Sequence, residues 1–84
     1  MDAKSFVLEI IRPTSAETIN VAWLEVESPT GSFVIGPQHS PLISLLKRKT
    51  DLIYQIADGP KIKIDVFGGL LRVQDDRVIV LLDS

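Results

Sequence analysis

Short runs of alternating apolar and polar residues recur along the whole chain. The run KIKIDVF is the clearest, because Ile62, Ile64 and Val66 fall on one face while lysine and aspartate side chains occupy the other. Side chains on a β-strand point alternately to opposite faces, so a period of two predicts a strand with one buried face. The runs DLIYQIA and DRVIVLLD are apolar on both faces, as expected of strands that lie between layers or under a partner.

The run NVAWLEVE also alternates, and it contains the only tryptophan. Ala22, Leu24 and Val26 form the set that is predicted to face the core. Val21 and Trp23 share the opposite phase with two glutamates, so period-two geometry places them on the face that meets solvent in the isolated chain. Trp23 is then either partly covered by an adjacent segment or an anchor for a partner, since tryptophan is enriched at interface hot spots.

Turn-forming residues separate these runs at short intervals. They are Pro13-Thr14, Ser28 to Gly31, Gly36-Pro37, Asp58 to Pro60, Gly68-Gly69 and Asp75-Asp76. Only residues 42–49 could be read as a helix, and that run is too short to form one convincingly. The pattern predicts one all-β domain over residues 1–84, a small β-sandwich or flattened barrel of about eight to ten short, mostly antiparallel strands.

Composition excludes several classes of function. The chain has 84 residues, 45% of them hydrophobic and 24% charged, which is ordinary for a small globular domain. Its net charge of −2 argues against nucleic acid as a partner, because neutralising phosphates calls for a basic excess. Without cysteine it has no disulfide, thiolate nucleophile or cysteine-based zinc site. No apolar run approaches the roughly 20 residues of a membrane helix, and the N-terminus lacks the pattern of a signal peptide.

The only histidine, His39, lies in the segment GPQHSPL between two prolines. It could be a metal ligand, a general base or a polar contact on a stiff loop, but nucleophilic catalysis also needs a nucleophile and an orienting group. A metal site would need several carboxylates, and the one acidic pair, Asp75-Asp76, has the composition of a hairpin turn. Gly68-Gly69 lacks the lysine and the following helix of a phosphate loop. The sequence therefore predicts no catalytic, cofactor-binding or metal site, and no enzyme.

Three motifs follow one another along the chain: GSFVIGPQHSPL, GGLLRV and VIVLLD. In this order and spacing they resemble the N-terminal β-sandwich of the ε subunit of F-type rotary ATP synthases, in which the first motif reads Gly-x-(Leu/Phe)-x-Ile-x-Pro-Gly-His-x-Pro-Leu. The opening run FVLEIIRPT looks like the family's first strand, so the resemblance spans essentially the whole chain. The matching residues are Gly31, Phe33, Ile35, Pro37, His39, Pro41, Leu42, Gly68, Gly69, Leu71, Val73, Val78, Val80, Leu81 and Asp83.

The chain departs from this family at several positions. Gln38 stands where the family usually has glycine, and Arg48-Lys49 replaces the usual Pro-Gly after Lys47. The C-terminal helical hairpin, which known family members use for regulation, is absent because the sequence ends with the sandwich at Ser84. The resemblance implies that such a form keeps the assembly role and loses the regulatory one.

The resemblance also implies a non-catalytic rotor subunit of the central stalk. Such a subunit couples the γ subunit to the membrane c-ring for ATP synthesis driven by an ion gradient, and it needs no cofactor of its own. It would associate with the energy-coupling membrane only through the complex, on the cytoplasmic face of a bacterial inner membrane. The alternative is a stand-alone β-sandwich adaptor that shares the fold, because fold does not fix function.

Two interaction surfaces are expected from the resemblance. Residues 31–42 are interpreted as a loop, stiffened by two prolines, that faces the c-ring. His39 there either contacts the ring or hydrogen-bonds to its own loop backbone, and one side of the sandwich is expected to pack on γ. The ring-facing candidates are Gly31, Ser32, Phe33, Pro37, Gln38, His39, Ser40 and Pro41. The γ-facing candidates follow from the strand phase of Trp23: they are Val21, Trp23 and, if their strand phase brings them alongside, Ile79 and Leu81.

Overall fold

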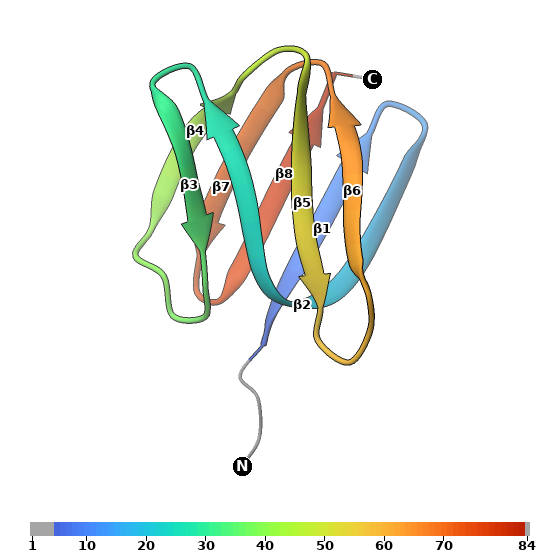
Figure 1. The fold of residues 1–84 in the computed structure, drawn as a ribbon, viewed down its shortest axis with the longest axis vertical. Coiled ribbons are helices and arrows are strands. Elements are labelled where there is room, and N and C mark those ends of the chain that lie inside the picture. Colours follow the sequence, from blue (N-terminus) through green and yellow to red (C-terminus); the bar gives the residue numbers. More distant parts are fainter. Residues whose placement is uncertain (1–4, 84) are drawn as a thin grey trace.

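The structure, a computed structural model, describes residues 5–83. These residues form eight β-strands and no helix (Figure 1), which confirms the predicted fold class. Residues 42–46, at the start of the one run with helical potential, are a strand. The strands are β1 (Phe6–Arg12), β2 (Ser15–Ser28), β3 (Gly31–Ile35), β4 (Leu42–Leu46), β5 (Thr50–Ile56), β6 (Lys61–Val66), β7 (Gly69–Gln74) and β8 (Arg77–Leu82).

All eight strands belong to one sheet that curls over itself. Its order is β4-β7-β8-β1-β2-β5-β6, and β3 pairs with the second half of β2. Among the described residues, six of the seven strand pairings are antiparallel. The remaining pair is parallel and joins the first strand, β1, to the last, β8. The mostly antiparallel arrangement that the short turns predict is therefore confirmed.

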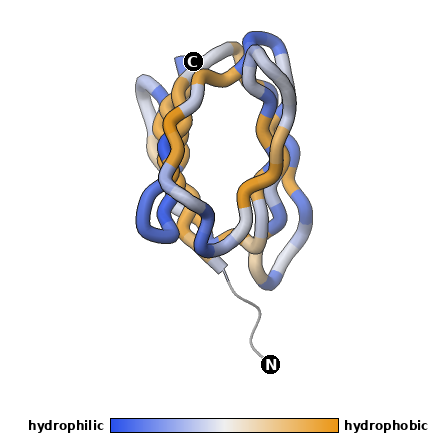
Figure 2. The backbone as a smooth tube through the Cα atoms, turned by 90° about the vertical axis from the view of Figure 1, so that its left-hand side faces the viewer, coloured by the Kyte–Doolittle hydropathy of each residue, from blue (hydrophilic) through white to orange (hydrophobic). Residues whose placement is uncertain are grey.

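The curl of the sheet depends on β2, which has 14 residues. Its first half pairs with β1, and its second half pairs with β5 on one side and β3 on the other. Where the halves meet, the register with β5 shifts between Val21 and Trp23, which is a β-bulge. A bulge bends a strand and increases its twist, so β2 can leave one layer and enter the other. Figure 2 shows the result as two walls that face each other.

A single apolar core lies between the two walls. The layer β4-β7-β8-β1 contributes inward side chains such as Leu8, Leu71 and Val80, which have no exposed surface. The layer β3-β2-β5-β6 contributes Leu24 and Ile35, which are equally buried. Protein interiors are packed as densely as organic crystals, so a core that joins both layers makes the domain resist deformation.

The position of Val21 contradicts the strand phase predicted from the sequence. Its side chain has no exposed surface and belongs to the core, although strict alternation places it on the face of Trp23. The bulge is the physical reason, because one extra residue reverses the alternation. Val21 and Leu24, three positions apart, consequently both point inward. The predicted outward orientation of Val21 is wrong, and its side chain is not available to a partner.

The two ends of β7 have special backbone geometry, a tight turn at one end and a close approach to β8 at the other. The β7–β8 hairpin has the two-residue turn Asp75-Asp76, with positive φ angles of 53° and 57°, so the hairpin predicted from this acidic pair is confirmed. At the other end of β7, Gly69 lies so close to β8 that an added Cβ atom would overlap the carbonyl oxygen of Leu81. Gly69 therefore allows β7 and β8 to approach each other closely.

Candidate functional site

The outer face of the layer β4-β7-β8-β1 carries a line of apolar side chains. Leu45, Leu70, Leu81 and Ile11 are neighbours in the register of four successive strands, and together they are called the apolar row. Leu45 is 63% exposed and Leu81 is 43% exposed, while the other two are half-buried. Single exposed apolar residues are common, but a contiguous exposed patch marks an interaction site. The apolar row is therefore the first candidate contact surface.

A second line of side chains lies beside the apolar row on the same face. Ile43, Arg72 and Ile79 are neighbours across β4, β7 and β8, two residues along each strand from the row. Ile43 is the most exposed large hydrophobic residue among those described, at 68%. Two hollows on this face share Leu70 and Leu81 as lining residues. The core of an interface is apolar and closely complementary in shape to its partner. This face offers apolar side chains and hollows into which a partner could pack.

The structure separates the residues that were predicted to face γ. Ile79 and Leu81 lie together on the apolar face of β8. Trp23 lies on the other layer, where it pairs with Gln55 of β5 and is half-buried. The strands that carry these residues belong to opposite walls of the sandwich (Figure 1), so Trp23 does not share a patch with Ile79 and Leu81.

The outer face that carries Trp23 is mixed in polarity. One line across its strands runs from Val34 through Glu25 and Ile53 to Lys63. The Lys63 Nζ atom lies 3.7 Å from Oδ2 of Asp51 in an exposed ion pair. Such pairs contribute little stability, and charged side chains are depleted at the centres of interfaces. The apolar face of β4-β7-β8-β1 is therefore the better candidate for burial against a partner.

The proline-containing loop is shorter than the sequence indicated. Residues 31–35 form β3 and pair with β2, which leaves residues 36–41 as the loop. Gly31 and Ser32 lie at the far end of β3, and a five-residue strand spans about 13 Å. Phe33 is half-buried and packs against the core. The interpretation of residues 31–42 as one loop is therefore wrong in its first part, because these residues alternate and join the sheet.

A hydrogen bond joins the loop to the β7–β8 hairpin. The Gln38 backbone N–H donates to Oδ1 of Asp76 at 2.5 Å, and the Asp76 carbonyl accepts from the Val7 N–H at 3.1 Å. His39 Nδ1 donates to the carbonyl oxygen of Ser40 at 2.8 Å. The bond from His39 to its own loop, one of the two predicted roles, is thus present, while contact with a ring stays a prediction. Loop, hairpin and the start of β1 form one connected end of the domain.

The described residues bring few chemical groups together. Within residues 5–83, no three His, Cys, Asp or Glu side chains are grouped so that they could hold a metal ion. This part of the chain also has no helix of the length and apolar character needed to cross a membrane. What it offers a partner is an apolar face on one layer and a braced loop at one end.

Sequence reasoning missed the β4 part of the apolar face. The strand LISLL has one polar residue, Ser44. Alternation alone would therefore place Ser44 on the face that meets solvent, and Ile43 and Leu45 on the buried face. The structure shows the reverse: Ile43 and Leu45 are exposed, and Ser44 shares the inward phase with Leu46. The Ser44 hydroxyl is satisfied locally, because it donates to the Leu45 carbonyl at 3.0 Å. The sequence signal that could have found this face lies in the neighbouring strand β7, where the charged residue Arg72 marks the set of side chains that faces solvent.

Two residues that stand where the resembling family has glycine adopt a left-handed backbone. Gln38 has φ 61° and Lys49 has φ 55°. A residue with a Cβ atom pays about 1–2 kcal/mol in this region, and glycine does not. Gln38→Gly and Lys49→Gly are each expected to raise the free energy of unfolding by about 0.5–1 kcal/mol in urea denaturation. Ser40→Gly, in the same loop without a positive φ, should lower it; a loss of stability in both glycine variants would contradict the account.

Comparison with known proteins identifies the family. Residues 5–84 match the model of the family described as ATP synthase, Delta/Epsilon chain, beta-sandwich domain. The chain is 30% identical to the ATP synthase epsilon chain of Desulforamulus reducens over 83 residues, covering 98% of this chain and 61% of that protein. It is 32% identical to the ATP synthase epsilon chain of Pelotomaculum thermopropionicum over 85 residues, covering 100% and 62%. The chain thus spans about three fifths of the length of these relatives.

Solved structures share the fold. The chain superposes with a TM-score of 0.89 on a chain of the Euglena gracilis mitochondrial ATP synthase, in its OSCP/F1/c-ring assembly, at 17% identity, covering 100% of this chain and 54% of that one. For the Tetrahymena thermophila mitochondrial ATP synthase central stalk and c-ring, the TM-score is 0.82 at 12% identity, with 100% and 67% covered. Since the family model also matches nearly every residue, the chain belongs to the β-sandwich family of the ATP synthase delta/epsilon chain.

Proposed function

We propose that this chain is the β-sandwich of a non-catalytic rotor subunit in the central stalk of an F-type ATP synthase. In this role it joins the γ subunit to the c-ring, so that rotation driven by an ion gradient reaches the catalytic sites. Family membership and the names of the relatives support the assignment to the complex. Its association with the membrane is then through the complex, and it needs no cofactor.

The exposed apolar row is the observation that carries this proposal. Leu45 and Leu81 expose large apolar surfaces on β4 and β8, the strands on either side of β7, and Ile43 on β4 is exposed beside them. Apolar area that is removed from water contributes about 25 cal/mol per Å², so a partner gains most by covering this face. We assign the apolar row and Ile79 to the contact with γ. Trp23, on the opposite wall, lies outside this contact.

The loop of residues 36–41 is assigned to the c-ring. Pro37 and Pro41 restrict its backbone, and the Gln38–Asp76 hydrogen bond ties it to the hairpin. A loop that is already ordered loses little conformational entropy when it binds. Because Nδ1 of His39 is bonded to its own loop, Nε2 is the ring nitrogen left for a partner. Such a loop can transmit force without first having to become ordered.

A charge placed in the apolar row tests the γ contact. Leu81→Asp is expected to weaken binding to a purified γ-containing subcomplex by about 100-fold or more, because the contact would remove the new carboxylate from water. Val34→Asp is the matched control, since Val34 is 57% exposed on the outer face of the other layer, and it should change binding by less than about twofold. Binding is measured by isothermal titration calorimetry, and thermal unfolding shows that both variants remain folded.

Two results would overturn the assignment. One is wild-type affinity of Leu81→Asp together with a large loss for Val34→Asp, which would move γ to the opposite wall. The other concerns the fluorescence of Trp23. If γ binds the apolar row, this fluorescence should change little. A blue shift and protection from quencher on adding γ would instead place Trp23 inside the contact.

A further inference from the structure

Arg72 is a charged residue in the middle of the apolar face. In the register of the sheet its cross-strand neighbours are Ile43 on β4 and Ile79 on β8. Along β7 its neighbours in the same phase are Leu70, which belongs to the apolar row, and Gln74. A partner that covers the row and the two isoleucines therefore covers Arg72 as well.

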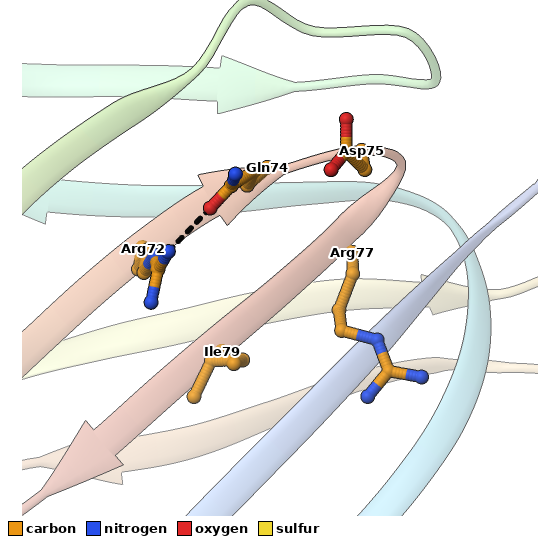
Figure 3. A pocket seen from close by; sticks show the side chains of 5 residues that line it. All are labelled: Arg72, Gln74, Asp75, Arg77 and Ile79. Carbon is orange, nitrogen blue, oxygen red and sulfur yellow. Dashed lines mark hydrogen bonds between the residues drawn. The ribbon is translucent and has the colours of Figure 1, made fainter.

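Among the described residues, the guanidinium group of Arg72 is only partly satisfied. Its Nη2 donates to Oε1 of Gln74 (Figure 3), and a guanidinium has five N–H donors in total. Among residues 5–83 no carboxylate forms an ion pair with Arg72. The second arginine that lines the same hollow, Arg77, differs because its Nη1 lies 3.4 Å from Oε1 of Glu9. Arg72 thus lacks a carboxylate partner among the described residues.

Burying such a group without a partner is unfavourable. An arginine in water satisfies its remaining donors with solvent, and an apolar contact surface would remove that solvent. A carboxylate restores the lost hydrogen bonds and does so in the planar, two-pronged geometry that arginine matches.

We propose that the γ segment covering the apolar row carries a carboxylate that pairs with Arg72 in the complex. This inference rests on the proposed function and adds the chemistry of the partner surface. Arg72 lies two residues along β7 from Leu70, which corresponds to about 7 Å. The acid on γ is therefore close in sequence to the apolar residues that cover the row, at a spacing of two in a strand or three to four in a helix.

The test compares two substitutions at Arg72 with a matched loss of charge elsewhere. Arg72→Met, which keeps the length and apolar stem of the side chain, is expected to weaken γ binding by about 30-fold or more, because the γ carboxylate is then buried alone. Arg72→Glu should weaken it further. Lys61→Met removes one positive charge from β6, in the other layer, and should change affinity by less than about twofold. Thermal unfolding should show all three variants folded like the wild type.

Charge reversal on the partner identifies the acid. Single Asp→Arg or Glu→Arg changes on γ are combined with Arg72→Glu, and one of them is expected to restore binding by about tenfold or more over Arg72→Glu alone. If Arg72→Met binds as tightly as the wild type while Leu81→Asp does not, the carboxylate inference fails and the γ contact stands. If no reversal on γ rescues Arg72→Glu, the inference also fails, because the partner group is then a carbonyl or an aromatic ring. A wild-type chain that does not bind γ overturns both.

Discussion

Replacing Gly69 with alanine is expected to lower the free energy of unfolding by about 3 kcal/mol or more. An added Cβ would overlap the Leu81 carbonyl oxygen and press on the backbone of Leu82. These atoms cannot move aside easily, because Gly69 and Leu82 are paired in the ladder between β7 and β8. Relief would require the strands to separate at the edge of the core.

Urea denaturation followed by circular dichroism measures this effect, and Gly36→Ala is the control. A Cβ atom at Gly36 would meet nothing within 4 Å, so that variant should unfold within about 0.5 kcal/mol of the wild type. If Gly69→Ala were as stable as Gly36→Ala, β7 and β8 could not approach as closely as described here.

Leu24→Ala is expected to cost about 2–5 kcal/mol of stability, since it empties a fully buried site in the middle of the second layer. Leu24 is paired with Ile35 on one side and Tyr54 on the other, both of them buried, so neighbouring strands cannot collapse into the space. The same chemical change at Leu45, which is 63% exposed, should cost less than about 0.5 kcal/mol.

The substitution at Leu45, which should barely change stability, should instead change γ binding. Leu45→Ala removes apolar surface from the proposed contact and is expected to weaken γ binding by about tenfold, while its unfolding curve in urea stays unchanged. A large stability loss at Leu45, or none at Leu24, would show that the assignment of inside and outside is reversed. Measuring both quantities on both variants separates folding from assembly.

The sequence predicts the fold class well where alternation is complete. In β6 the apolar residues Ile62, Ile64 and Val66 face inward and the charged residues between them are exposed, as their period of two requires. The bulge in β2 has no comparable signal, because the residues around Ala22 include no glycine or proline to mark it. One extra residue therefore moved Val21 from the predicted surface into the core. The local pattern of apolar and polar residues predicts that a segment is a strand more reliably than it predicts which of its side chains face the core.

The candidate surface was predicted only in part, for a related reason. Ile79 and Leu81 were candidates on the condition that their strand phase brings them beside Trp23. Whether Trp23 lies beside them depends on which layer each strand joins, and this is set by long-range pairing. The loop was predicted too long, because residues 31–42 were interpreted as one segment, whereas Gly31 and Ser32 pair with β2. Register and layer are properties of the whole sheet.

The parallel pairing of β1 with β8 has a mechanical consequence. The two strands run side by side in the same direction, from the pair Val7–Arg77 to the pair Ile11–Leu81. A pull that draws the start of β1 and the end of β8 apart acts along both strands, so their hydrogen bonds are sheared together. An antiparallel hairpin pulled at its open end instead loses its bonds one at a time. A domain loaded through its first and last strands is thus protected against rupture by geometry, even where its equilibrium stability is modest.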